Sequence, residues 1–170
     1  GAPSPDGKYL TYVDWGQFAN LGVRDLVKGE NRILTDIKSW GSAAMCYLSK
    51  FSSDGSQIAY SWQTEKMRSQ LRVINLDGSS MRILHDREGV SYQMPVGWAA
   101  DGKQILTAFW GKDPNLRLAY VSTMDGSVKD LMMLSRKLPR TPIMSLSPDG
   151  KYIACSYPPH EDSPNSDILL

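Results

Sequence analysis

The sequence is poor in the residues on which most catalytic and metal chemistry depends. Its 170 residues include only two histidines and two cysteines. Two histidines leave little acid–base capacity near neutral pH, and two cysteines cannot build a disulfide framework or a zinc knuckle. A Gly-x-Ser-x-Gly elbow and a glycine-rich phosphate loop are both missing. We therefore expect a protein that is not an enzyme and that holds no cofactor and no metal.

Long apolar runs and blocks of one charge are also missing. No stretch approaches the roughly 20 apolar residues of a membrane-spanning helix, so no membrane insertion is expected. The 19 basic and 18 acidic residues are interspersed and leave a net charge of +1. This balance gives no reason to expect nucleic acid as a partner. No signal peptide precedes the opening Gly1-Ala2-Pro3, which suggests a trimmed start.

The most informative feature that is present is a turn that occurs four times. Its glycines are spaced by 48, 47 and 48 residues. Proline presets the second position of a type I turn, aspartate suits the third, and glycine adopts the left-handed conformation that closes a hairpin. The four copies are Ser4-Pro5-Asp6-Gly7, Ser52-Ser53-Asp54-Gly55, Ala99-Ala100-Asp101-Gly102 and Ser147-Pro148-Asp149-Gly150.

Each turn is flanked by segments with the composition of β-strands. An aliphatic residue follows every glycine at the third position, and no segment shows a capped helical period. The predicted strands before the turns are 45–51, 93–98 and 141–146, and the first copy lacks this strand. The strands after the turns are 8–12, 56–60, 103–107 and 151–155, followed by 21–26, 71–75 and 118–122, and then by 32–34, 82–84 and 129–133.

Four-stranded antiparallel units that repeat every 40 to 50 residues are typical of β-propeller blades. Kelch and WD propellers share the period, but their double-glycine, Gly-His and Trp-Asp signatures are missing here. The Ser-Pro-Asp-Gly-Lys turn with its following strand, the Asp-Gly turn and the short fourth strand resemble the TolB-like, WD-related repeat over the whole chain. We expect an all-β fold of about 3.5 blades, with approximate limits 1–38, 39–86, 87–135 and 136–170.

This resemblance implies a non-catalytic scaffold that binds another protein, in the periplasm or another extracytoplasmic space of a bacterium. It does not identify the partner. Similar repeats also occur as regulatory or sensory propeller domains beside prolyl-oligopeptidase-type hydrolases and receptor-like kinases, so this second function stays open. Catalysis by the propeller itself is the weakest alternative, because no cluster of carboxylates recurs at matching positions of the repeat.

About fourteen predicted strands are too few for a closed ring, so the chain should form an arc with an apolar face at each end. Two interpretations follow. The chain is a fragment of a larger propeller, or two chains form a homodimer whose roughly 28 strands complete a ring of seven blades.

Some aromatic residues fall outside the repeat and are candidates for partner contact: Trp15, Trp40 and Trp110. Three others recur at one repeat position and are expected to pack between blades: Trp62, Phe109 and Tyr157. Trp98 stands where the other copies have Phe51 and Leu146, so it too should lie in the core.

The segment 157–167 is rich in proline and acidic residues. His160, Glu161, Asp162 and Asp167 could in principle ligate a metal, but their spacing fits no known cage. We therefore interpret the segment as a rigid exposed loop, with His160, Glu161 and Asp162 as further candidates for partner contact.

Two other polar features receive structural interpretations. His85-Asp86-Arg87-Glu88 resembles part of a catalytic triad, but with no nucleophile elbow in the chain we expect a polar connection between blades. Cys46 and Cys155 lie in apolar stretches and should be inert buried thiols, although a disulfide between them stays open.

Overall fold

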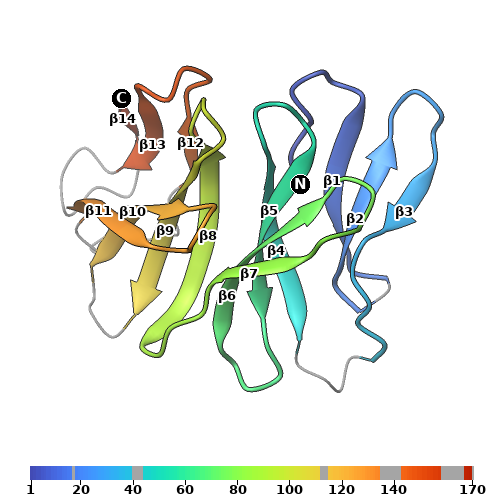
Figure 1. Ribbon diagram of the computed structural model, residues 1–170, viewed down its shortest axis with the longest axis horizontal. Helices are drawn as coiled ribbons and strands as arrows, with labels where there is room; N and C mark the ends of the chain where they lie inside the picture. Colours follow the sequence, from blue (N-terminus) through green and yellow to red (C-terminus); the bar gives the residue numbers. More distant parts are fainter. Residues whose placement is uncertain (17, 40–43, 112–114, 135–142, 158–166, 170) are drawn as a thin grey trace.

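The computed structural model describes residues 1–16, 18–39, 44–111, 115–134, 143–157 and 167–169, with only the backbone described for 157 and 167–169. Within these residues every regular element is a β-strand, so the all-β prediction is confirmed. The strands form four separate antiparallel sheets that stand side by side in an open arc (Figure 1). The fold is therefore a partial propeller, and each sheet is one blade.

The four blades follow the order of the chain. Blade 1 has the strand order β1-β2-β3, blade 2 β4-β5-β6-β7, blade 3 β8-β9-β10-β11 and blade 4 β12-β13-β14. The bounds are β1 (Tyr9–Asp14), β2 (Asn20–Asp25), β3 (Asn31–Ile33), β4 (Met45–Phe51), β5 (Gln57–Gln63), β6 (Ser69–Asn75), β7 (Arg82–His85), β8 (Val90–Trp98), β9 (Gln104–Gly111), β10 (Leu116–Ser122), β11 (Val128–Leu134), β12 (Met144–Leu146), β13 (Ile153–Tyr157) and β14 (Asp167–Leu169).

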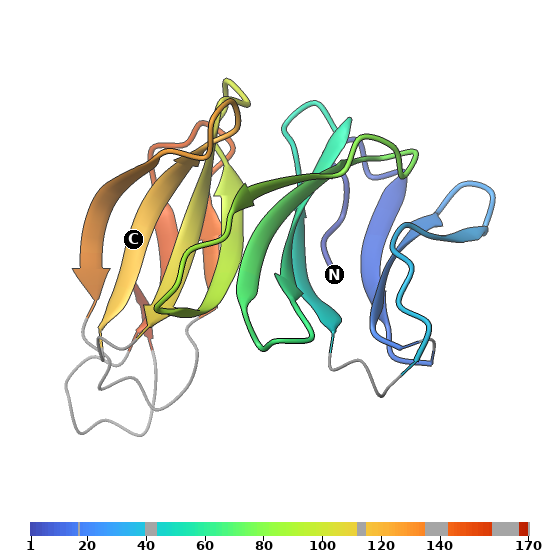
Figure 2. The same cartoon turned by 60° about the horizontal axis from the view of Figure 1, so that its bottom comes forward.

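The first strand of each blade lies on the inner side of the arc. β4 contacts β8, and β8 contacts β12, whereas the last strands β3, β7 and β11 splay outward (Figure 2). We predicted that blade 1 lacks its first strand, and the structure corrects this in part, because a short segment occupies that position. Pro3 forms a β-bridge with Leu10, and the Thr11 N–H donates to the carbonyl of Ala2 at 2.9 Å, so two residues hold the inner position there.

The repeated turns are held by the same hydrogen bonds in three copies. In blade 2 the Ser52 hydroxyl donates to the Asp54 carboxylate at 2.6 Å and accepts the Gln57 N–H at 2.9 Å. The carboxylate also accepts the Ser56 N–H, and Gly55 has a φ of 73°. Blades 1 and 4 repeat this pattern around Ser4 and Ser147. The serine thus has a structural role in the turn, because it links the carboxylate to the start of the next strand.

We predict that Ala99→Ser stabilises the protein. In the third copy the backbone bonds of the turn are kept, but Ala99 supplies no hydroxyl for Asp101 or for the Gln104 N–H. A restored serine should add about 0.5–1 kcal/mol to the free energy of unfolding, measured by urea denaturation. The matched reverse change, Ser52→Ala, should lower it by a similar amount. A loss of stability in Ala99→Ser would show that the turn cannot accept the hydroxyl.

The turn carboxylates also predict how stability depends on pH. The serine hydroxyl, followed by a backbone N–H, lowers the pKa of Asp6, Asp54 and Asp149, and the Ser127 N–H is the main cause that lowers the pKa of Asp125 to about 2. A lowered folded-state pKa gives stability that is full above the unfolded value near 3.9 and is lost as the pH falls through the folded value.

The urea midpoint should therefore stay constant from neutral pH to about pH 5 and fall steadily between about pH 4 and 2. Asp149→Asn should reduce the size of that fall, because asparagine accepts the same bonds without titrating. A midpoint that is unchanged at pH 3 would contradict this account of the turns.

The core consists of three clusters, one in each seam between neighbouring blades. Along β5, Ile58 and Tyr60 face blade 1 in the first seam, whereas Ala59 faces blade 3 in the second seam. Leu106 and Ala108 of β9 pack on Met144 and Cys155 in the third seam. Both faces of an inner blade are buried, which explains why these strands carry no simple alternation of apolar and polar residues.

Polar bonds accompany the apolar contacts in the second seam. The fully buried Gln93 of β8 donates through Nε2 to the Ser69 carbonyl at 2.6 Å and contacts His85 Nδ1 through Oε1 at 2.9 Å. The Ser61 hydroxyl donates to the Gln93 carbonyl at 2.6 Å. His85 is thus the buried end of β7, and the polar connection expected there begins only at Asp86.

Among the described residues the end faces of the arc are mixed rather than wholly apolar, because Ile33 of blade 1, which pairs with Gly22, shares its face with polar residues. On the outer side of blade 1, cross-strand pairing places Arg24 beside Leu10 and Asn31, while the Tyr12 ring lies across Gly22. On the outer side of blade 4, the described side chains include the small or polar Ser145, Ala154 and Ser156, but also Ile143, which pairs with Ser156 and is 81% exposed. Most large apolar side chains therefore lie in the seams, while the end faces combine polar residues with a few apolar ones.

Candidate functional site

The two edges of the blades differ in what they display. The turn edge carries the four repeated turns and the turns before β3, β7 and β11, and it lies at the top of Figure 2. The opposite edge, here called the loop edge, carries the connections that lead into β2, β4, β6, β8 and β10. Trp15 follows β1 at the loop edge and is 58% exposed, as a contact residue should be. Whether Trp15 binds a partner stays a prediction.

Trp110 does not stand alone as an exposed ring. It is half-buried near the end of β9 and packs on Tyr92 of β8 with ring centroids 5.7 Å apart. Tyr92 in turn meets Tyr47 of β4 edge-on at 5.1 Å. These three residues, Tyr47, Tyr92 and Trp110, form an inner aromatic row that joins blades 2 and 3. Two of its members lie on the inner strands of the arc.

A bulge in β4 produces this row. The pairing register of β4 with β5 shifts between Cys46 and Ser49, which leaves Tyr47 and Leu48 without cross-strand partners in the ladder. Leu48 is 42% exposed beside Tyr47. Burial raises the pKa of Tyr92 to about 12, with Tyr47 as a smaller cause, so the phenol stays neutral at any physiological pH. The row offers half-buried rings beside an exposed leucine, which is a surface suited to apolar contact.

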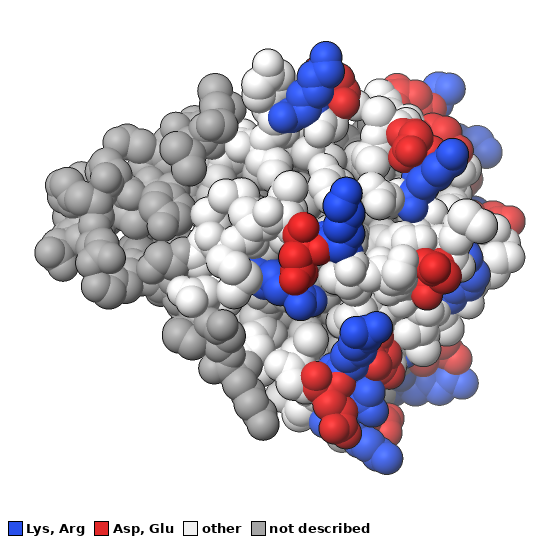
Figure 3. All heavy atoms as spheres, turned by 60° about the vertical axis from the view of Figure 1, so that its left-hand side comes forward, with Lys and Arg blue, Asp and Glu red and all other residues white. Residues whose placement is uncertain are grey.

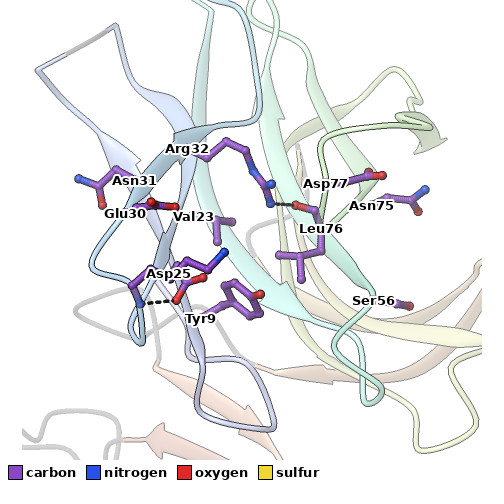
Figure 4. A pocket seen from close by; sticks show the side chains of 11 residues that line it. Tyr9, Val23, Asp25, Glu30, Asn31, Arg32, Ser56, Asn75, Leu76 and Asp77 are labelled. Carbon is purple, nitrogen blue, oxygen red and sulfur yellow. Dashed lines mark hydrogen bonds between the residues drawn. The ribbon is translucent and has the colours of Figure 1, made fainter.

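A second concave feature lies in the first seam at the turn edge. It is a groove of about 800 Å³ between the outer strands of blade 1 and the β6–β7 turn of blade 2. Figure 4 shows Arg32 of β3 crossing it, where its guanidinium donates to the Leu76 carbonyl at 2.5 Å. Arg82 repeats this contact in the second seam by donating to the Thr123 carbonyl at 3.1 Å. The arginines are thus part of the repeat and link each outer strand to the next blade.

The groove is open because the first seam is wider than the second. An added Cβ on Gly126 would lie 1.9 Å from the Leu84 carbonyl oxygen, so the second seam is closed at that point. At the equivalent glycine of the first seam, Gly78, the nearest atom is a Leu34 methyl at 3.5 Å. Side chains at this end of the first seam therefore remain open to solvent.

The acidic groups of the groove are already engaged in their own turns. The Asp25 carboxylate accepts the Lys28 and Val27 N–H groups, and these bonds lower its pKa. The Asp77 carboxylate accepts the hydroxyl and N–H of Ser79, with the same effect on its pKa. Both groups are anionic acceptors at neutral pH, so the groove offers polar contacts rather than a proton donor.

The remaining sequence candidates fall into three groups. Trp98 and Phe109 are buried core residues as expected, and the Trp98 indole also donates to the Lys50 carbonyl of blade 2 at 3.0 Å. Trp62 is only partly buried and lines a pocket at the loop edge. Outside the described residues lie Trp40, His160, Glu161 and Asp162, together with the side chains of Tyr157 and Asp167.

The two thiols are free, buried and in different seams, Cys46 in the first and Cys155 in the third. A disulfide between them within one chain is therefore excluded. Burial raises the pKa of Cys46 to about 12 and also raises the pKa of Cys155, so both are poor nucleophiles. The prediction of inert buried thiols agrees with this geometry.

The charges on the surface are mixed. On the face seen in Figure 3, Lys and Arg alternate with Asp and Glu, and an uncharged area lies between them and the grey atoms. Exposed apolar residues of this part of the arc include Leu131, Met132 and Met133 of β11 and Tyr152 of blade 4. Of the described residues, no three His, Cys, Asp or Glu are grouped as metal ligands would be. No described helix is long and apolar enough to cross a membrane.

Sequence reasoning missed Tyr47, Tyr92 and Leu48. Their grouping depends on the β4 bulge and on the pairing of Tyr92 with Trp110, and neither register is visible in one sequence. The only available signal was Trp110 itself, which departs from the repeat. Its cross-strand partner on β8 could have been named once the strands were aligned.

Solved structures with the same fold are found, although no family model and no curated protein sequence matches the chain. TolB from Acinetobacter baumannii is 20% identical over 98% of this chain and 38% of its own, with a TM-score of 0.72. A prolyl endopeptidase is 20% identical over 100% of this chain and 29% of its own, with a TM-score of 0.65.

The β-propeller domain of the Trilobed protease from Pyrococcus furiosus, described as having an open velcro topology, is 17% identical over 96% of this chain and 49% of its own, with a TM-score of 0.57. The chain thus spans less than half the length of these three structures. Identities this low establish the fold alone. In its fold the chain is an open arc of four β-propeller blades, similar to the propeller of TolB.

Proposed function

We propose that the chain is a non-catalytic scaffold that binds another protein through the inner side of the arc. The inner aromatic row is the observation that carries this proposal. Tyrosine and tryptophan are the residues most often responsible for binding energy at protein interfaces, especially where they are partly packed and need little ordering. Leu48 adds an exposed apolar side chain next to Tyr47. The similarity to TolB supports a scaffold, and it also supports our proposal of an extracytoplasmic location.

The proposal predicts that Leu48→Arg weakens partner binding without unfolding the chain. Peptides selected on the immobilised protein from a displayed library would serve as the probe, with affinities measured by calorimetry. A cation beside the aromatic row should weaken the selected peptides by at least about tenfold, because the contact desolvates the leucine.

Leu131→Arg is the matched control. Leu131 is a similarly exposed leucine on the outer strand β11, at 47% against 42% for Leu48. The Leu131→Arg variant should leave the affinity for the selected peptides unchanged. Equal binding by both variants and the unaltered protein, or loss only in Leu131→Arg, would place the binding surface elsewhere and refute the proposal.

A second function is a regulatory propeller domain of a larger hydrolase. The similarity to a prolyl endopeptidase and to an acylaminoacyl peptidase from Pyrococcus horikoshii supports it, because in each the match covers less than a third of that protein. Labelling of the full-length gene product by a fluorophosphonate, which reacts with activated serines, would favour this function over a free-standing scaffold.

The end faces bear on the proposal that a second copy of the chain completes the ring. Ring closure would bury the Arg24 guanidinium, which donates to the neutral Asn31 side chain at 3.2 Å, at a mixed end face. Because burying a charge without a counter-ion costs free energy, we expect a monomer in dilute solution by light scattering. Twice the mass of the chain, stable on dilution, would instead support the homodimer of seven blades.

A further inference from the structure

One arginine breaks the pattern of the repeat. Arg72 of β6 pairs with Tyr60 of β5 and faces the first seam. The equivalent residues are Gly22 in blade 1, which pairs with Tyr12, and Ala119 in blade 3, which pairs with Thr107. Both are buried and neither is charged. A blade can therefore be built with a small residue here, so the guanidinium is not required by the fold.

Two neighbours, Gln70 and Trp62, hold Arg72 in position. Its Nε and one Nη donate to the side-chain oxygen of Gln70, at 2.8 and 2.5 Å. Its guanidinium carbon lies 4.3 Å from the centre of the Trp62 ring, a cation–π geometry. Gln70 is itself held by Asp86, to which its amide donates at 2.6 Å. The guanidinium is thus fixed before any ligand arrives.

No counter-ion for Arg72 is present among the described residues. Asp86, the nearest acidic group in this chain of bonds, is paired with Arg68 at 2.6 Å. A guanidinium has five N–H donors, and Gln70 takes only part of them. A half-buried cation whose partners are a neutral amide and a ring face lacks the charge that usually offsets its desolvation.

A buried acceptor next to Arg72 is also unsatisfied. The Tyr60 hydroxyl is fully buried and has no hydrogen-bond partner. Burial raises the pKa of Tyr60 to about 12, and two effects of Arg72 oppose that rise: its charge and a weaker side-chain interaction with the Tyr60 hydroxyl. An unpartnered buried polar group beside an uncompensated cation is uncommon in a structure that serves folding alone.

Arg72, Gln70 and Trp62 line a pocket, and Tyr60 lies behind Arg72 outside its lining. The pocket has a volume of about 430 Å³, opens at the loop edge, and is lined by Trp62, Gln70, Arg72 and the Arg68–Asp86 pair, with Ala44, Thr64, Glu65 and Lys66 around them. The lining thus holds two further cations, Lys66 and Arg68, and two carboxylates, of which Asp86 is paired with Arg68. We propose that this Arg72 pocket binds a carboxylate, which pairs with the free side of the guanidinium while Trp62 packs against the apolar part of the ligand.

The guanidinium of Arg72 favours a planar anion as its ligand. A guanidinium forms two parallel hydrogen bonds with a carboxylate, and the pairing is stronger where water is partly excluded. The ligand is either a free dicarboxylic acid or an acidic side chain of a peptide. The site lies apart from the inner aromatic row, so it does not depend on the proposed scaffold function.

The test is a titration of the labelled protein at low salt, followed by NMR at the Arg72 Nε–H and the Trp62 indole. Glutarate is the free acid, and acetyl-Gly-Glu-Gly-amide presents the same group on a peptide. Both resonances should shift saturably with millimolar dissociation constants. The peptide with glutamine in place of glutamate should cause no shift. Binding of glutarate alone would identify a small acid as the ligand, and binding of both would identify a side chain.

Three variants separate this site from general attraction to positive charge. Arg72→Met keeps the packing on Trp62 and should weaken binding by at least about tenfold. Arg72→Lys keeps the charge but not the two parallel N–H donors, and it should weaken binding less. Arg24→Met makes the same change on the equivalent strand of blade 1 and should have no effect. The proposal fails if the unaltered protein shows no saturable shift, or if Arg24→Met weakens binding as much as Arg72→Met does.

Discussion

The structure depends on the burial of each sheet against its neighbour. A single four-stranded sheet has two faces and cannot cover either of them alone, so each blade is stable only as part of a stack. In the second seam Ala59 and Val73 of blade 2 meet Ile105 and Phe109 of blade 3, and all four are almost fully buried. Each fully buried side chain of Val, Ile or Phe size contributes about 1.5–3 kcal/mol, which makes the seams the main source of stability.

This constraint explains where the chain must be regular and where it is free to vary. The inner strands approach closely, and an added Cβ on Gly97 of β8 would lie only 2.7 Å from the Cβ of Leu146 on β12. The repeated turns lie at the same edge and set where β5, β9 and β13 begin. The connections at the loop edge carry no such requirement, so residues outside the repeat, such as Trp15, collect there.

The sequence predicted most of the fold because the turn is a local signal that occurs four times. One Asp-Gly turn predicts one hairpin, but equal spacing predicts equivalent strands, and β4 begins and ends where the pattern placed it. The bonds that the turns make, such as Ser52 to Asp54, are a local consequence of the same residues. Prediction therefore succeeded wherever partners lie within about one hairpin of each other.

Prediction failed where partners come from different blades. The contact of Tyr47 with Tyr92 needs the β4 bulge and the docking of blade 3 on blade 2, and neither follows from local pattern. The end faces were predicted only in part, for a similar reason. The repeat places apolar residues there, and Leu10 and Ile33 follow it on blade 1, but Arg24 lies on the same side, which only the pairing register shows.

The seams are equivalent in backbone but not in chemistry, and the difference is informative. In the second seam the buried polar atoms of Gln93 are matched by Ser69 and His85, so the polar network is satisfied and joins the blades. In the first seam the Tyr60 hydroxyl makes no hydrogen bond of normal geometry, and the described partners of Arg72, Gln70 and Trp62, are neutral. A fold that repeats the same unit supplies its own comparison, because the neighbouring blades show what stability requires at each position. What the first seam carries beyond that requirement is therefore best explained by a ligand.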